Sequence, residues 1–299
     1  MFRLLELLLP HLPASTSAWI VCRLAFHPYR YRIKPEEVRV RQSGQQFLYG
    51  SGLHAWKWGR TGPVVVLVHG WGGASVQWRR FIQPLVDAGY RVVAPDISGH
   101  GMSSGRRIGF DSFAEDLATL SRSLGPDGIH AFVGHSAGGL GMMAARYLHG
   151  LEARKFVCIA TPSYPYPPVK VLKKKLRLPD KVTELFKVSL ARQFRTNWDQ
   201  ISARAFREAA EGELMLIYDR RDRYLDGDDV ERILAFWPGA RVYLTENISR
   251  ESHPRGRIHR DGTGIPEGVS RVAEACPCAR LIPDPAPPSR GLVALQGET

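Results

Sequence analysis

Short, continuous runs of apolar residues recur along the middle of the chain. They lie at residues 64–68 (VVVLV), 90–94 (YRVVA), 131–133 (AFV), 156–160 (FVCIA), 213–218 (ELMLIY) and 240–244 (ARVYL). Continuous runs rich in β-branched residues are typical of parallel strands that are buried on both faces. The pattern therefore predicts a largely parallel sheet.

Residues with helical apolar spacing fill the gaps between these runs. Four such segments are residues 76–88, 110–124, 140–148 and 228–237. Strand, helix and strand in succession predict a doubly wound α/β sheet with helices on both sides. Before the first run, alternating residues at 39–49 and 53–58 predict a hairpin that turns at residues 50–52.

The two ends of the chain and one long gap complete the predicted organisation. The gap between the runs that end at residue 160 and begin at residue 213 predicts an inserted lid of two or three helices, at about residues 163–211. We place the α/β domain at residues 37–249 and a helical segment at residues 1–36. Residues 250–299 hold seven of the 21 prolines and a C-P-C sequence. That composition predicts a poorly ordered tail, either a lineage-specific extension or a stretch read out of frame.

The first residues, M-F-R-L-L-E-L-L-L-P, have the basic residue and the leucines of a secretion signal, but Glu6 and Pro10 interrupt the apolar run. The interruption favours an amphipathic first helix, which packs on the domain or lies on a surface, over a signal peptide. No run of about eighteen apolar residues occurs, so we expect no transmembrane span.

The net charge of +12 is concentrated in the expected lid, where residues 163–211 hold eleven Lys or Arg against five Asp or Glu. Within its densest part, V-K-V-L-K-K-K-L-R-L, Val169, Leu172 and Leu176 follow helical spacing. No aromatic ladder accompanies the charge, and we therefore expect no nucleic-acid partner. A solvated helix face is the plainer interpretation. The alternative is a lid that attracts anions and makes weak contact with an anionic membrane surface.

Four cysteines, Cys22, Cys158, Cys276 and Cys278, are too few for a disulfide scaffold and lack the paired spacing of a zinc site. Their number predicts a reducing compartment, the cytoplasm. No metal-binding cluster or dinucleotide-binding glycine pattern is present in the sequence, so we expect neither a metal nor a cofactor.

Residues 134–138, G-H-S-A-G, follow a predicted strand and open a predicted helix. The turn of a G-x-S-x-G motif is so tight that its serine is strained, and the flanking glycines allow close approach of the neighbouring backbone. Ser136 would lie above the sheet at a helix N-terminus, where developing negative charge is stabilised. This setting favours a nucleophile over an ordinary helix-capping serine.

A glycine-rich loop, V-H-G-W-G-G at residues 68–73, follows an earlier strand. A serine that attacks a carbonyl needs two fixed N–H donors for the oxyanion. The backbone N–H groups of Trp71 and Ala137 are the natural pair. The other interpretation, a phosphate-binding loop, would need a G-K-[ST] sequence that does not follow.

Together with P-D-I-S-G-H-G-M-S at residues 95–103, these motifs resemble those of the α/β-hydrolase fold superfamily, in particular its small serine hydrolases. The resemblance extends from about residue 39 to residue 247. It implies an eight-stranded, mostly parallel sheet whose second strand is antiparallel. It also implies a triad in the chain order Ser, Asp, His. A serine at the nucleophile position argues against the dehalogenases and epoxide hydrolases of this fold, which use aspartate.

The resemblance places the triad acid in D-R-R-D, which stands where the family has G-x-x-D. Asp222 takes the position of the acid, with Asp219 as the alternative, and ion pairs with the neighbouring arginines are the structural interpretation. The base is displaced, because Arg250 stands where the family has histidine. R-I-H-R-D at residues 257–261 resembles the segment after the catalytic histidine. That leaves His253 as the base, with His259 or the lack of any functional base as alternatives.

Two functions follow from this reading. The first is a serine hydrolase that cleaves a small carboxylic ester or thioester through an acyl-enzyme, with Ser136, Asp222 and His253 as its triad. The second is a catalytically silent protein of the same fold that binds an acyl ligand, a partner or an anionic surface. Trp71, Trp78 and the Y-P-Y-P-P stretch at residues 164–168 either line an apolar acyl pocket or belong to the core.

Overall fold

Eight strands form one sheet in the computed structural model, which describes residues 2–28, 30–105, 108–125, 128–198, 204–207, 212–222 and 224–245. The strands are β1 (Gln45–Gly50), β2 (Leu53–Trp58), β3 (Val64–Val68), β4 (Arg91–Pro95), β5 (Ile129–His135), β6 (Lys155–Ile159), β7 (Glu213–Asp219) and β8 (Arg241–Thr245). Their order across the sheet is β1-β2-β4-β3-β5-β6-β7-β8. Only β2 runs against its neighbours. The expected doubly wound, mostly parallel sheet of eight strands is therefore confirmed.

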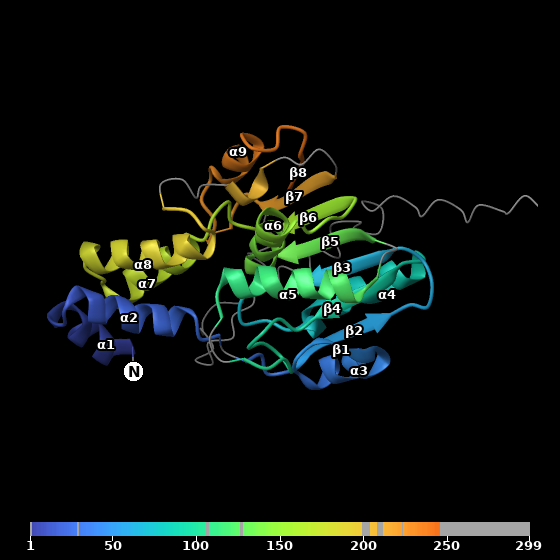
Figure 1. The fold of residues 1–299 in the computed structure, drawn as a ribbon, viewed down its shortest axis with the longest axis horizontal. Helices are drawn as coiled ribbons and strands as arrows, with labels where there is room; N and C mark the ends of the chain where they lie inside the picture. The colour runs from blue at the N-terminus through green and yellow to red at the C-terminus, as the bar shows by residue number, and fades with distance from the viewer. Residues whose placement is uncertain are drawn as a thin grey trace, which may run out of the picture.

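Helices cover both faces of this sheet. The described helices are α1 (Phe2–Leu8), α2 (Ala14–Ala25), α3 (Pro35–Ser43), α4 (Arg79–Asp87), α5 (Phe110–Ser123), α6 (Ala137–His149), α7 (Pro167–Leu176), α8 (Asp180–Gln193) and α9 (Asp229–Leu234). α5 and α6 pack side by side over one face, as Figure 1 shows, and bury Phe113 and Met142 there. α4 buries Phe81 and Leu85 against the other face. Each such side chain contributes about 1.5–3 kcal/mol when fully buried.

Four helices, α1, α2, α7 and α8, form a separate group that we call the helical lobe (Figure 1). In its described residues, the expected insertion contains α7, α8 and a short 3₁₀ turn at Arg204–Phe206. The N-terminal segment expected at residues 1–36 contains α1, α2 and the start of α3. Phe26, just after α2, packs on Phe186 of α8 with ring centroids 6.2 Å apart. Glu6 of α1 pairs with Arg177, which follows α7, at 2.8 Å. The lobe thus joins two helical segments that are far apart in the sequence.

The lobe lies beyond the carboxyl ends of the parallel strands, toward which the arrows of β3 and β5 point in Figure 1. Phe194, the residue after α8, packs against Phe110 at the start of α5. The side chain of Gln193 accepts a hydrogen bond of 2.7 Å from the Phe110 N–H. None of the described helices combines the length and the apolar composition needed to cross a bilayer.

One predicted element is wrong, because residues 39–43 belong to α3 rather than to the first strand of the hairpin. Proline suits the first turn of a helix, where its missing N–H has no intrahelical partner, and the helix begins at Pro35. The buried Glu37 accepts the N–H of Lys34 at 2.9 Å and closes this end. The strand β1 therefore begins only at Gln45.

Candidate active site

Ser136 is the single residue between β5 and α6, and its backbone has φ 51° and ψ −120°. A residue other than glycine at positive φ is strained by its own Cβ. The strained position is held by hydrogen bonds, since the Ser136 N–H donates to the carbonyl of Ile159 at 2.9 Å and the Ser136 carbonyl accepts from Leu140 at 3.1 Å. Half-buried at the head of α6, Ser136 has the geometry expected of a nucleophile elbow.

The glycines on either side of Ser136 have no room for a side chain. A Cβ on Gly134 would lie 2.6 Å from the backbone of Gly139. A Cβ on Gly138 would lie 2.3 Å from the carbonyl oxygen of His69 and 2.5 Å from that of Val68. Both contacts are with backbone atoms, which cannot move aside as a flexible side chain can. The spacing of the motif is therefore dictated by close packing of β5 on α6 at Gly134 and of α6 on the end of β3 at Gly138.

The glycine-rich loop after β3 forms a tight turn beside the elbow. Its closing hydrogen bond runs from the Gly73 N–H to the Gly70 carbonyl at 3.0 Å, and Gly72 takes the positive φ of 71°. A Cβ on Gly70 would lie 3.5 Å from the Cβ of Ser136, so the two backbones are in contact range. Trp71 stands at the corner of this turn. Ala137 opens α6, where N–H groups have no partner within the helix.

Two buried histidines hold the turn in place. The His69 Nε2 accepts the Ile97 N–H at 3.1 Å, which leaves its Nδ1 proton for the Gly70 carbonyl at 2.8 Å. The His100 Nε2 accepts the Gly72 N–H at 2.9 Å. Because the acceptor nitrogen of each ring is occupied by a backbone N–H, neither ring has a lone pair left to take the serine proton.

Burial keeps these rings neutral. It lowers the pKa of His69 to about 4, and the hydrogen bond to the Gly70 carbonyl only partly opposes this shift. It lowers the pKa of His100 to about 3, with the neighbouring His69 acting in the same direction. The ring centroids lie 4.9 Å apart. Two neutral imidazoles side by side avoid the repulsion that a charged pair would suffer, so they act as structural supports of the turn.

The two candidate acids lie at the carboxyl end of β7. Asp219 ends that strand, and its carboxylate accepts the Arg221 N–H at 2.8 Å and the Thr245 hydroxyl at 3.5 Å. Asp222 is half-buried in the following turn, where its Oδ1 accepts the Tyr224 N–H at 2.8 Å. Thr245 pairs with Asp219 across β7 and β8, so β8 ends beside this turn. His253 and His259, and the whole tail expected at residues 250–299, lie outside the described residues.

Residues 63–194, which contain the elbow and the glycine-rich turn, match the model of the α/β hydrolase fold family. The chain has the α/β-hydrolase fold. An esterase from Pyrococcus furiosus superimposes with a TM-score of 0.55 at 20% identity, over 74% of this chain and 87% of that one. At that identity the likeness shows the shared hydrolase fold.

Curated relatives match over shorter stretches. A bifunctional esterase/perhydrolase of Acinetobacter calcoaceticus is 37% identical over 111 residues, which are 35% of this chain and 40% of the relative. The 30 kDa subunit of the magnesium chelatase of Rhodobacter capsulatus is 43% identical over 81 residues, which are 26% of this chain and 28% of the relative. The matched part therefore spans about a quarter to two-fifths of the length of these two relatives.

Of the aromatic residues considered as the lining of an acyl pocket, some lie beside the elbow and others lie elsewhere. Trp71 is partly buried beside the elbow of the hydrolase fold, with its ring stacked on Phe113 at 5.9 Å. Trp78 follows the other alternative and belongs to the core, because it is fully buried on the α4 face, edge-on to Phe81. Tyr166 is also fixed elsewhere, since its hydroxyl donates to the Asp229 carboxylate at 2.5 Å.

Asp229 is a buried carboxylate that sequence reasoning missed. It accepts the N–H and the hydroxyl of Ser163 at 2.8 and 2.6 Å, in addition to the Tyr166 hydroxyl. These bonds tie the start of α9 to the segment between β6 and α7. The only signal in the sequence is the acidic first turn of a predicted helix, which does not reveal that one of its carboxylates is buried.

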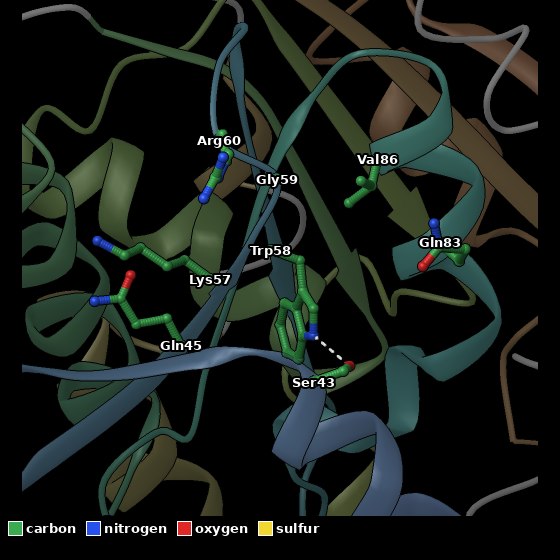
Figure 2. Close-up of a pocket in the computed structure, with 8 residues that line it drawn as sticks. All are labelled: Ser43, Gln45, Lys57, Trp58, Gly59, Arg60, Gln83 and Val86. Carbon is green, nitrogen blue, oxygen red and sulfur yellow. Dashed lines mark hydrogen bonds between the residues drawn. The ribbon is translucent and has the colours of Figure 1, made fainter.

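One pocket in the described part of the chain, of about 380 Å³, lies far from the elbow. Figure 2 shows its lining, with Lys57 and Arg60 on one side and Gln83 on α4 on the other. Trp58 in its floor donates to the Ser43 hydroxyl at 3.1 Å. Trp58 pairs with Val92 near the start of β4, so the pocket is at the amino ends of the parallel strands. Ligands of doubly wound sheets bind at the opposite edge, and the pocket is therefore not the acyl site.

Proposed function

We propose that this chain is a serine hydrolase that cleaves a carboxylic ester or thioester through an acyl-enzyme intermediate. The observation that carries the proposal is the conformation of Ser136, strained at φ 51° at the head of α6 and in contact range of the Gly70 turn. A strained serine beside two preorganised N–H groups is the arrangement that acyl transfer requires. A helix-capping serine has no need of either feature.

In the acylation step, the Oγ of Ser136 attacks the carbonyl carbon while its proton passes to the imidazole of His253. The N–H groups of Trp71 and Ala137 stabilise the oxyanion that forms on the carbonyl oxygen. Asp222 orients the imidazole and stabilises it when it is protonated. Collapse of the tetrahedral intermediate breaks the bond to the leaving alcohol or thiol, which takes the proton from the imidazolium.

In the deacylation step, the same groups act on water. The imidazole removes a proton from the water that attacks the acyl carbon, and Ser136 leaves with that proton. The reaction consumes one water and releases the free acid, so no cofactor is needed to balance it. The names of an esterase and an esterase/perhydrolase among the similar proteins support this class of reaction.

The substrate that best fits the proposal carries a short or medium acyl chain. Trp71, Phe110 and Phe113 form an aromatic cluster beside the elbow, with ring centroids 5.9 to 6.4 Å apart. Phe110 and Phe113 are buried, so the partly exposed Trp71 is the ring that an apolar acyl group would contact, with little polar selectivity. Turnover of soluble butyrate esters should exceed turnover of emulsified long-chain esters, and the reverse order would contradict this preference.

Labelling with a fluorophosphonate tests the proposal, because the probe reacts only with an activated serine. We expect the probe on Ser136 of the folded wild type, none on Ser136→Ala, and unchanged labelling of Ser51→Ala, which alters an exposed turn. A folded wild type that takes up no label would contradict the proposal. That result would favour the silent acyl-binding protein.

Separate His253→Ala and His259→Ala variants test the base. We expect His253→Ala to lose ester turnover and His259→Ala to keep it. If His253→Ala is fully active, His253 is not the base.

A further inference from the structure

Exposed apolar side chains are concentrated in the helical lobe. Among the described residues, fourteen large apolar side chains are exposed, and eight of them belong to the lobe or to the turn between α1 and α2. These eight are Leu4, Leu7, Leu8, Leu12, Trp19, Val171, Leu185 and Val188. Single exposed apolar residues are normal on any protein. Their concentration in one small group of helices indicates a binding surface.

The α1 helix carries the strongest part of this surface. Leu4, Leu7 and Leu8 follow the spacing i, i+3, i+4, so they share one face of the helix, and they are 60%, 67% and 49% exposed. Leu5 packs against the core. The exposed leucine face is thus not needed to hold the helix in place. The ion pair between Glu6 and Arg177 also attaches α1 to α7.

The α7 helix, which packs against α1, carries exposed positive charge. Lys173, Lys174 and Lys175 follow one another in its last turn, and all three are exposed. Lys173 pairs with Asp180 at 2.8 Å, so part of its charge is already compensated. Across residues 2–28 and 167–194, however, ten Lys or Arg stand against three Asp or Glu. The lobe therefore holds most of the net positive charge of the chain.

We propose that the helical lobe docks on the surface of an anionic phospholipid bilayer, with the leucines of α1 in the interface and the lysines of α7 on the lipid phosphates. An apolar helix face flanked by cations is the pattern of interfacial binding, and each cation near such a surface adds to the affinity. Trp19, 57% exposed and 5.3 Å below the guanidinium of Arg23, is the amphipathic type of side chain found at headgroup level.

The positive charge of the lobe favours an anionic bilayer over a second copy of the chain as its binding partner. Two lobes that met face to face would bring two strongly positive surfaces together, which is unfavourable. An anionic bilayer complements the same charge. The docking is independent of ester cleavage, but it would hold the carboxyl edge of the sheet, where Ser136 lies, on the membrane side of the molecule (Figure 1).

Vesicle flotation of the full chain tests the proposal without any turnover. We expect wild type to float with vesicles of phosphatidylcholine mixed with phosphatidylglycerol and to stay behind with phosphatidylcholine alone. Lys173→Gln/Lys174→Gln/Lys175→Gln should lower the partition coefficient by roughly tenfold to a hundredfold at low salt. High salt should remove the difference between this variant and wild type. Leu4→Ser/Leu7→Ser/Leu8→Ser should lower the partition coefficient by roughly tenfold or more.

Matched controls test whether flotation depends on the lobe itself or on exposed cations and leucines anywhere on the chain. Leu48→Ser removes a leucine that is 62% exposed on β1, and Arg39→Gln/Lys57→Gln/Arg60→Gln removes three exposed cations that lie outside the lobe, on α3, on β2 and just after β2. Both should float like wild type, and circular dichroism should show all variants folded. Equal flotation of the lobe and control variants, or no flotation of wild type, would overturn the proposal. So would a wild-type dimer in sedimentation that the leucine variant dissociates, because the patch would then join two copies.

Discussion

The backbone N–H of Gly72 donates a hydrogen bond of 2.9 Å to the Nε2 of His100, 28 residues further along the chain. Because Nε2 is the acceptor, the ring proton lies on Nδ1, which is 3.0 Å from the carbonyl of Ser98. One neutral imidazole therefore links the loop after β4 to the turn that presents Trp71. The ring is fully buried, so we expect it to act on the proposed oxyanion donor, the Trp71 N–H, only through its hydrogen bond to Gly72.

His100→Phe should lower kcat by about tenfold to a hundredfold with little change in KM, because it removes the acceptor and loosens the turn. His100→Gln offers an acceptor oxygen and should recover part of the loss. Steady-state kinetics with p-nitrophenyl butyrate measure both parameters. If kcat falls equally in the two variants, or if the change appears in KM instead, the hydrogen bond to Gly72 does not position the proposed oxyanion donor.

The same ring should make stability depend on pH. The pKa of His100 is lowered to about 3 by burial, whereas an unfolded histidine titrates near 6.5. Between these values only the unfolded chain binds the proton, so the free energy of unfolding falls as the pH falls. From pH 7 to pH 5, His100 alone should remove about 2 kcal/mol.

The comparison of wild type with His100→Gln isolates this effect. Asp116, whose pKa burial raises to about 6, works in the opposite direction, but it is present in both proteins. Urea unfolding at pH 7 and pH 5 should show a loss that is about 2 kcal/mol smaller in the variant. Identical losses would mean that His100 is not buried in its neutral form.

The sequence predicted the buried strands to within about two residues at most ends, and β3 at residues 64–68 without error. Burial on both faces demands continuous β-branched runs, and such runs have few other uses. α3 was misread because Val38 and Val40 alternate with Arg39 and Arg41, which imitates a strand. Pro35 followed by two glutamates was the signal that could have identified a helix start.

The site was predictable where backbone geometry fixes residue type. Gly134 and Gly138 are required by contacts that leave no room for a Cβ. The supporting histidines were not predictable, because the partners of His100 are backbone groups that only tertiary folding brings together. The difference between Trp71 beside the elbow and Trp78 in the core has the same origin, since Trp71 lies in the glycine-rich loop and Trp78 follows it closely in the sequence.

Gly138→Ala should destabilise the fold by about 1–3 kcal/mol and abolish labelling of Ser136. Its Cβ would overlap the carbonyl oxygens of Val68 and His69, and the turn beside the elbow would have to move. Gly227→Ala is the matched control, because no heavy atom lies within 4 Å of its Cβ position. Urea unfolding and fluorophosphonate labelling measure the two effects. If Gly138→Ala has the free energy of unfolding and the labelling of wild type, the close packing around Gly138 is refuted.

Asp222→Asn should lower kcat on the order of a thousandfold, because an amide cannot stabilise the protonated imidazole. Asp219→Asn should leave kcat close to wild type, since an amide oxygen can still accept the Arg221 N–H that Asp219 accepts at 2.8 Å. The two kcat values, measured with the same ester, decide between the acids. A larger loss in Asp219→Asn would transfer the role to Asp219.

Acylation of Ser136 during turnover is tested most directly by rapid quenching of the enzyme with p-nitrophenyl butyrate, followed by peptide mass mapping. We expect a butyryl group on the peptide that contains Ser136 and a burst of p-nitrophenol that matches the enzyme concentration. Ser136→Ala should show neither. Turnover by wild type with no acyl group on that peptide, or undiminished turnover by Ser136→Ala, would contradict the serine hydrolase mechanism.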